Sequence, residues 1–237
     1  MLSRAPVVAL AAVLVLAAPA RAFEPTSTYK KQTLHGFTVM IGAEALRNKR
    51  DSDAALRELD VELNRITLNV PPASLKVLKG IKIWLEWRAD DAPKNVIARF
   101  FPGDRWVREH DANPEKASAI EIVNTRLFVS ARDNGQPCVM IHELAHGYHW
   151  LTLQKQNRAI EAAYKQAVDR RLYDDVEHFN GFRGRGYAVT NPHEYFATLS
   201  ESYFGKSANF PYDRGGLLRY DTAGYWLMRE TWGATTP

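Results

Sequence analysis

The sequence predicts an α+β fold, because strand patterns and helix patterns occupy different parts of the chain. Residues 81–87, IKIWLEW, alternate in the way that is typical of a strand. Later in the chain, apolar side chains recur every three or four residues, which is typical of amphipathic helices. We therefore expect a strand-rich part, 23–136, and a helical part, 137–237, within one domain that covers 23–237.

The first 22 residues are typical of a cleaved secretory signal peptide. An apolar run covers residues 6–18, and the small-x-small triplet ARA at 20–22 precedes Phe23. The run is shorter than the roughly 20 residues that cross a bilayer, so an uncleaved anchor is the less favoured alternative. We expect a secreted or periplasmic protein with no membrane span after cleavage.

Charge and cysteine content narrow the classes of partner. Loss of residues 1–22 removes two arginines and no acid, which lowers the formal net charge from +4 to +2. The remaining basic residues are scattered along the chain, so we expect no nucleic-acid partner. We also expect a monomer. The single cysteine, Cys138, excludes an intramolecular disulfide. Stability must then come from core packing, with a bound metal as a further source.

Two further segments of the strand-rich part have clear signals. Residues 52–66 form a helical pattern with Ser52 as the expected cap. The apolar face of this helix consists of Leu56, Leu59, Leu63 and Ile66. Residues 118–130, SAIEIVNTRLFVS, are a strand candidate that bends near Asn124.

Three helices are expected in the helical part. The first has Pro137 in its first turn, and its apolar face consists of Ile141, Leu144, Ala145, Tyr148 and Leu151. The second covers residues 157–176. The third has Asn191 as its cap, Pro192 in its first position and Gly205 as its stop.

Residues 142–146, HELAH, match the pattern H-E-x-x-H. Residues four apart on a helix lie about 40° apart around the axis and about 6 Å along it, so His142 and His146 can converge on one ion. Glu143 can take a proton from water bound to such an ion. If these side chains only packed in the helix, two imidazoles and a carboxylate would be buried without partners, which is costly. We therefore expect a metal site.

His149 is not expected to be the third ligand. It lies about 10 Å along the helix axis from His142, whereas zinc ligand atoms lie about 2 Å from the ion. Three ligands on one straight helix would also approach the ion from one side. We interpret His149 as a neighbour of the site or a surface residue.

The third ligand should come from a later element, and spacing alone does not select it. The candidates are Glu161, Asp174, Asp175, Glu177, His178, His193, Glu194 and Glu201. Glu194 also has a structural role open to it, because a glutamate three positions after the cap residue Asn191 closes a capping box.

The segments HELAHGYH and YAVTNPHEYFA resemble the catalytic domain of the anthrax lethal factor-like metallopeptidases, which include the Pro-Pro endopeptidases. The match covers about residues 100–237 loosely and is specific in these two motifs. The resemblance implies a zincin-like fold, in which a mixed sheet with an edge strand is followed by the active-site helix and C-terminal helices. It assigns a zinc ion, Zn²⁺, to His142, His146 and Glu194.

The resemblance also implies a division of roles. Glu143 would be the general base for the attacking water, and Tyr187 would stabilise the oxyanion or protonate the leaving group. A packing role is the alternative for Tyr187. The family often has an acid four residues after the glutamate ligand, but Thr198 occupies that position here. Glu201 would replace this acid or be a solvated helix residue, and we favour the second interpretation.

Zincins align the substrate backbone along an edge strand beside the active-site helix, and residues 120–129 are the candidate for this strand. An ordinary core strand is the alternative for this segment. We expect Cys138 to be a small buried thiol. Trp226 and Trp232 are expected to fill the core.

These observations predict an exported zinc metallopeptidase that acts on a peptide or protein substrate, as an endopeptidase rather than an exopeptidase. One alternative is a zinc-stabilised, catalytically inactive binding protein of the cell envelope, which leaves no use for Glu143. The other is a carbohydrate- or envelope-binding protein that uses its aromatic residues. The substrate loops of the Pro-Pro endopeptidases have no match here, so their specificity does not carry over.

Overall fold

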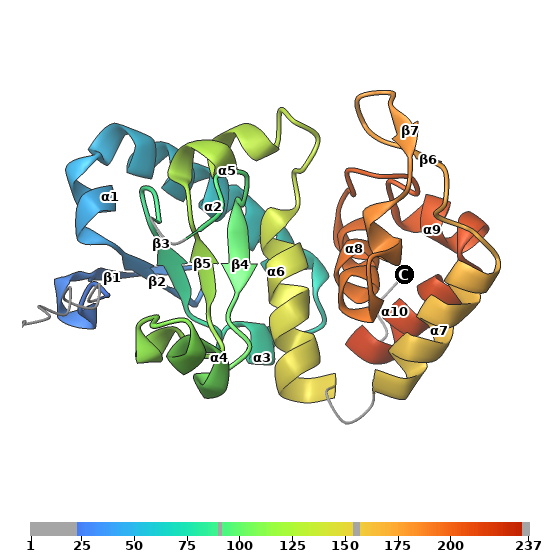
Figure 1. Ribbon diagram of the computed structural model, residues 1–237, viewed down its shortest axis with the longest axis horizontal. Coiled ribbons are helices and arrows are strands. Elements are labelled where there is room, and N and C mark those ends of the chain that lie inside the picture. The colour runs from blue at the N-terminus through green and yellow to red at the C-terminus, as the bar shows by residue number, and fades with distance from the viewer. Residues whose placement is uncertain (1–22, 90–91, 154–156, 234–237) are drawn as a thin grey trace, which may run out of the picture.

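The computed structural model describes residues 23–89, 92–153 and 157–233 (Figure 1). The predicted signal peptide, residues 1–22, lies outside these ranges. A five-stranded mixed sheet and a set of helices confirm the α+β class. None of the described helices is long and apolar enough to cross a membrane.

The sheet has the strand order β1-β2-β3-β5-β4. The strands are β1 Lys30–Leu34, β2 Phe37–Ile41, β3 Ile83–Leu85, β4 Ala98–Phe100 and β5 Ile120–Ile122. The three central strands run parallel, while β1 and β4 pair antiparallel at the two edges. All three residues of β3 are buried, because side chains cover both faces of the sheet at its centre.

Helices also occur between the strands, so the expectation that residues 23–136 are mainly strand is wrong, and only the helix at 52–66 was predicted there. They are α1 Ala43–Arg47, α2 Lys49–Asn69, α3 Pro72–Leu78, α4 Asp104–Glu109 and α5 Thr125–Ala131. Leu59, Leu63 and Ile66 of α2 are buried in the main core, as predicted. Ser52 does not cap this helix, since it lies inside α2 and its hydroxyl donates to the carbonyl of Ala45.

The segment 118–130 is half strand and half helix, so its prediction as one bent strand is wrong. β5 ends at Ile122, and the Asn124 side chain accepts hydrogen bonds from the backbone N–H of Arg126 and of Leu127. This cap starts α5. β5 also lies between β3 and β4, so the edge strand on this side of the sheet is β4 and not the predicted segment.

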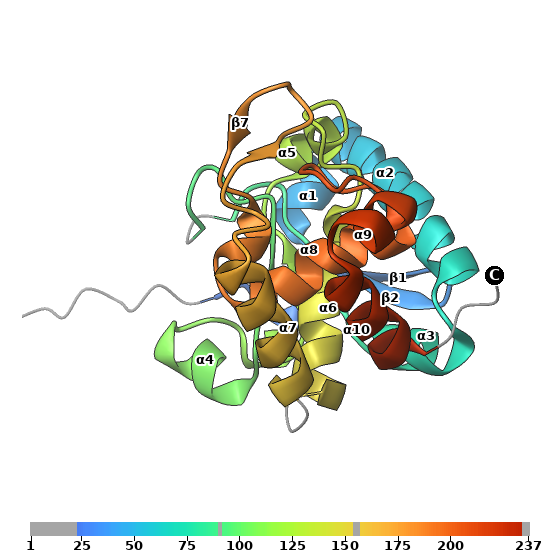
Figure 2. The ribbon, with the colours of Figure 1, turned by 90° about the vertical axis from the view of Figure 1, so that its right-hand side faces the viewer.

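The second part of the chain is mainly helical. Its helices are α6 Val139–Tyr148, the π-helix η3 His149–Leu153, α7 Asn157–Asp169, η4 Tyr187–Val189, α8 Pro192–Phe204, α9 Arg214–Tyr220 and α10 Thr222–Trp232. α6 packs against both β4 and α8, so it joins the sheet to the other helices (Figure 1). Figure 2 shows these helices facing the viewer.

The predicted helix boundaries hold best for α8. Asn191 caps it by accepting from the N–H groups of His193 and Glu194, Pro192 is its first residue, and Gly205 ends it. By contrast, Pro137 does not lie in the first turn of a helix as predicted, because α6 begins at Val139.

Three predictions for this part are wrong. α7 ends at Asp169, where the chain turns and Arg171 takes a positive φ of 55°. Leu151 is 44% exposed, because the π-helix after Tyr148 changes the register of the side chains. Trp232 is buried as expected, but Trp226 is 44% exposed.

A short hairpin of β6 Val176–Glu177 and β7 Arg183–Gly184 reaches toward the loop between α5 and α6. The ring of Phe179, in the hairpin turn, lies directly on Gly135 of that loop. A Cβ atom at Gly135 would come within 1.9 Å of the ring, and Gly135 has a φ of +80°. Only glycine adopts this conformation without strain and leaves room for the ring.

Candidate metal centre

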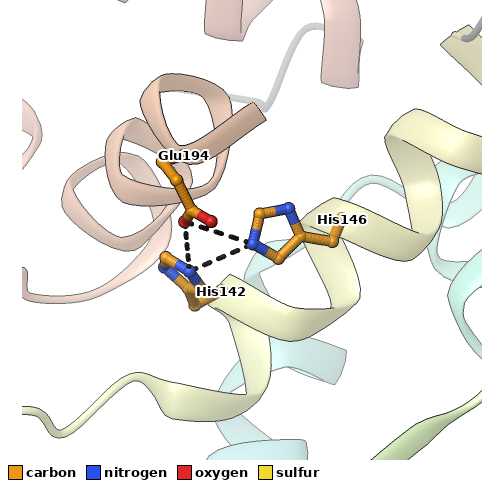
Figure 3. A group of neighbouring side chains, drawn as sticks. All are labelled: His142, His146 and Glu194. Atoms are coloured by element: carbon orange, nitrogen blue, oxygen red, sulfur yellow. Dashed lines mark hydrogen bonds and ion pairs between the residues drawn. The ribbon is translucent and has the colours of Figure 1, made fainter. Parts of the chain in front are cut away.

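Three side chains from two packed helices point to one place (Figure 3). His142 and His146 come from α6, and Glu194 comes from the first turn of α8. His142 Nε2 lies 3.1 Å from Glu194 Oε2 and 3.2 Å from His146 Nε2, and the third side of the triangle measures 3.4 Å. Among the residues that the structure describes, this is the one group of three possible ligands this close together.

The triangle fits a divalent ion. Tetrahedral coordination with bonds of about 2.0 Å places ligand atoms about 3.3 Å apart. The observed separations of 3.1–3.4 Å agree with this value. Two imidazoles and one carboxylate can hold several divalent metals, so the geometry alone does not select zinc.

Glu194 has two roles, one for its backbone N–H and one for its carboxylate. Its backbone N–H donates to Asn191 Oδ1 at 3.0 Å, which belongs to the helix cap. Its carboxylate points to the two histidines instead of closing a capping box. Burial opposes ionisation, but the hydrogen bonds with His142 and His146 hold the pKa of Glu194 below its usual value.

Glu201 supports the site from behind. Its Oε1 lies 2.6 Å from His142 Nδ1, so the interpretation of Glu201 as a solvated residue is wrong. Position 201 lies two turns beyond Glu194 on the same side of α8, and α8 packs along α6. A carboxylate on Nδ1 fixes the ring and leaves Nε2 directed at the ligand point.

The same two carboxylates control the protonation of His142. Burial lowers its pKa, but the hydrogen bonds with Glu194 and Glu201 outweigh this and raise the pKa well above its usual value. Protons and a metal ion therefore compete for this group of side chains.

Glu143 is 9% exposed and lies beside the triangle. Burial raises its pKa, and the nearby imidazoles of His142 and His146 oppose this rise. A carboxyl group whose pKa is moved toward neutrality can both accept and return a proton.

Tyr187 lies in η4, where its ring centre is 6.0 Å from that of His142. Tyr187 is 50% exposed, which is unlike a tyrosine that only packs in the core. Burial, followed by the charges of Glu194 and Glu143, raises the pKa of Tyr187 to about 12. The phenol is therefore protonated at neutral pH and can donate a hydrogen bond.

Two cavities meet at the cluster. The first has a volume of about 720 Å³, and the second has a volume of about 500 Å³. Both are lined by Ala98, His142, Glu143 and Tyr187. Since Ala98 begins the edge strand β4, the two cavities form one cleft that follows β4 past the cluster.

His149 lies outside the ligand triangle, as expected. It is 3% exposed, so it is a buried neighbour of the site and not a surface residue. Its Nδ1 lies 3.2 Å from Nδ1 of His193, and both residues line the first cavity. Burial lowers the pKa of His149 to about 4, so this ring is neutral at pH 7.

The other candidate ligands do not join the triangle. They are Glu161, Asp174, Asp175, Glu177, His178, His193 and Glu201. Cys138 is a buried thiol, as predicted, and it accepts hydrogen bonds from Lys206 N and Arg65 Nη1. Burial raises its pKa to about 11.

The sequence interpretation missed the wall of the cleft. β4 and Pro102 line the first cavity, together with Trp150. The only sequence signal for this strand is the short apolar run at 96–98, which is too short to predict a strand or its place at the edge.

Comparisons with known proteins assign no family to the chain. No family model, no curated protein and no solved structure matches it. Functional inference therefore starts from the ligand triangle, its neighbouring carboxylates and the cleft.

Proposed function

We propose that the protein is an exported zinc metallopeptidase with a zincin-like fold that hydrolyses peptide bonds in peptide or protein substrates. The main support is the triangle of His142, His146 and Glu194, which fits one tetrahedral ion. Two imidazoles and one glutamate are a donor set used by catalytic zinc sites, which keep one position open. A zinc ion held there would supply Lewis acidity toward water and toward the substrate carbonyl.

Glu201 and Glu143 would then have separate tasks. Glu201 accepts the Nδ1–H of His142 and keeps the Nε2 lone pair directed at the ligand point. Glu143 takes a proton from the attacking water and passes it to the amine that leaves. Its raised pKa suits both halves of this transfer.

Tyr187 would serve as the donor to the developing oxyanion. It projects into both cavities beside the cluster, and its phenol keeps its proton at neutral pH. A hydrogen bond that forms only when charge develops on the substrate oxygen stabilises the transition state more than the ground state.

β4 would guide the substrate. In the described sheet, β4 pairs on one side with β5 and lies at the edge on its other side. An extended peptide can add to such an edge as a further strand. Because the cleft continues on both sides of the cluster, we propose cleavage within a chain rather than at its end.

Metal analysis combined with one variant tests this function. The purified protein should contain about one zinc per chain, and a chelator should abolish peptide cleavage until zinc is restored. Glu143→Gln should retain the metal and lose the cleavage activity, because only the proton acceptor is removed. Glu109→Gln changes an exposed acid on α4 and should leave both properties unchanged.

Two results would contradict the proposal. A folded, metal-free protein with full peptidase activity would exclude zinc catalysis. A zinc-containing protein that cleaves no member of a broad peptide library would instead support the inactive binding protein of the cell envelope.

A further inference from the structure

A third cavity, of about 360 Å³, lies on the face of the sheet opposite the main core. It is lined by five acids and by three lysine or arginine side chains. The acids are Glu24, Glu44, Glu86, Asp111 and Glu121. Phe23, the residue directly after the predicted signal peptide, also lines this cavity.

Two of the three cationic side chains that line the cavity form ion pairs with its two buried acids. Lys116 Nζ donates to Glu86 Oε1 at 2.9 Å and also to Glu121. Arg99 Nε donates to Glu121 Oε2 at 2.7 Å, and the Tyr29 hydroxyl donates to Glu86 at 2.6 Å. Each charge in this network has a close partner of opposite sign, which offsets the cost of burying it.

Glu44 and Asp111 complete the acidic lining, and neither forms an ion pair within the described part of the chain. Lining acids therefore outnumber lining cations at this cavity. Such a surface is complementary to a positively charged group.

The start of the described chain is held at this cavity. Glu24 Oε1 accepts from the Thr28 hydroxyl at 2.6 Å and from Ala43 N at 3.0 Å. The Asn113 side chain, which is 4% exposed, donates to the Glu24 carbonyl at 3.1 Å. With Glu24 fixed by both its side chain and its backbone, the backbone nitrogen of the preceding residue, Phe23, is held close to the cavity, although Phe23 itself is 47% exposed.

We propose that this cavity is the binding site of the mature N-terminus. Cleavage after residue 22 turns the uncharged amide nitrogen of Phe23 into an α-ammonium group, with a pKa of about 8. This cation then pairs with Glu44 and Asp111. The inference rests on the predicted cleavage site and is independent of the proposed peptidase function.

Arg99 lies between the third cavity and the cleft. Its guanidinium pairs with Glu121 in the third cavity, and Arg99 is also part of β4 and lines the first cavity beside the metal cluster.

Two forms of the protein that differ only at the N-terminus test the proposal. One begins at Phe23 after scarless removal of a fusion partner, and the other carries Gly-Ser before Phe23. Glu44 and Asp111 are exposed, so an ion pair with them contributes up to about 1 kcal/mol. The form that begins at Phe23 should therefore melt about 1–3 °C higher. The double change Glu44→Gln and Asp111→Asn should remove the difference, while Glu109→Gln should preserve it.

Chemical labelling gives a second measurement that does not depend on activity. In the form that begins at Phe23, acylation of the α-amine near neutral pH should be several-fold slower in the folded than in the unfolded protein. In the Gly-Ser form, folding should change this rate little. Equal melting temperatures together with equal labelling rates would overturn the proposal, as would an exported protein whose first residue is not Phe23.

Discussion

His142 has a different partner on each of its ring nitrogens. Nδ1 faces Glu201 at 2.6 Å, whereas Nε2 faces Glu194 and His146. The two carboxylates are seven residues apart on one helix, yet only one of them can be a ligand in the triangle. The other sets the tautomer and the orientation of the ring.

Substitutions of these two acids should separate the roles. Glu194→Ala removes a ligand, whereas Glu201→Ala removes only the orienting partner, for which a loss of about 10- to 100-fold in metal affinity is typical. We expect a larger loss for Glu194→Ala, measured by competition with a chromophoric zinc chelator. The opposite order would move the third ligand from Glu194 to Glu201.

Glu62 makes stability depend on pH. Its Oε2 accepts from Met140 N at 2.7 Å at the start of α6, and burial raises its pKa from 4.5 to about 8. Between these values the folded protein keeps a proton that the unfolded chain releases. The free energy of unfolding should therefore fall as pH rises through this window, by up to about 1.4 kcal/mol per pH unit.

Glu62→Gln should remove this component, because the amide imitates the protonated acid. Urea unfolding of both proteins from about pH 5 to about pH 8 gives the comparison. The free energy of unfolding of the variant, relative to the wild type, should increase steadily with pH. A constant difference across the range would show that Glu62 has the same pKa in both states.

At the scale of elements, the cap of α8 both starts a helix and positions a ligand. Asn191 accepts from the N–H groups of His193 and Glu194, so it fixes the turn from which the Glu194 carboxylate reaches α6. Loss of such a cap costs about 1 kcal/mol. Asn191→Ala should therefore lower both the free energy of unfolding and the affinity for the metal.

Asn124→Ala is the matched control, because Asn124 caps α5 in the same way and lies outside the ligand cluster. It should lower stability by a similar amount, about 1 kcal/mol, and leave metal affinity unchanged. Calorimetry combined with metal titration measures both quantities. If both variants bind metal like the wild type, the cap does not position Glu194.

For the whole molecule, the sequence predicted features that depend on neighbouring residues better than features that depend on how the elements pack together. The cap, the proline and the final glycine of α8 lie within one short stretch, and each acts on its own helix. The pairing of Glu201 with His142 depends on how α8 lies along α6, and no helix pattern contains that information. From the sequence alone, Glu201 is therefore predicted to be a solvated residue of an amphipathic helix.

The position of β4 was unpredictable for the same reason. Its three residues are too few for a periodic pattern, and its place at the edge depends on which strands pair with β5. The prediction of one strand across Asn124 failed because the side chain of a single residue ended the strand and began a helix.

The contact between the hairpin and Gly135 can be tested at this scale. Gly135→Ala places a methyl group where the Phe179 ring now lies, so the ring must leave. Gly181→Ala has the same φ of +80° with no atom within 4 Å, and it measures the backbone strain alone. Chymotrypsin should cut at Phe179 and Phe182 faster in Gly135→Ala than in Gly181→Ala, and equal rates would contradict a holding role for the contact.

The Phe179 contact also closes a loop of the chain at one end of the cleft. This loop runs from Gly135 through α6 and α7 to the hairpin, and the non-covalent contact of the Phe179 ring with Gly135 joins its two ends. The residues beside this junction, Gln136 and Asn180, line the second cavity. The width of the second cavity at this end therefore depends on the Phe179 ring and on the absence of a side chain at Gly135.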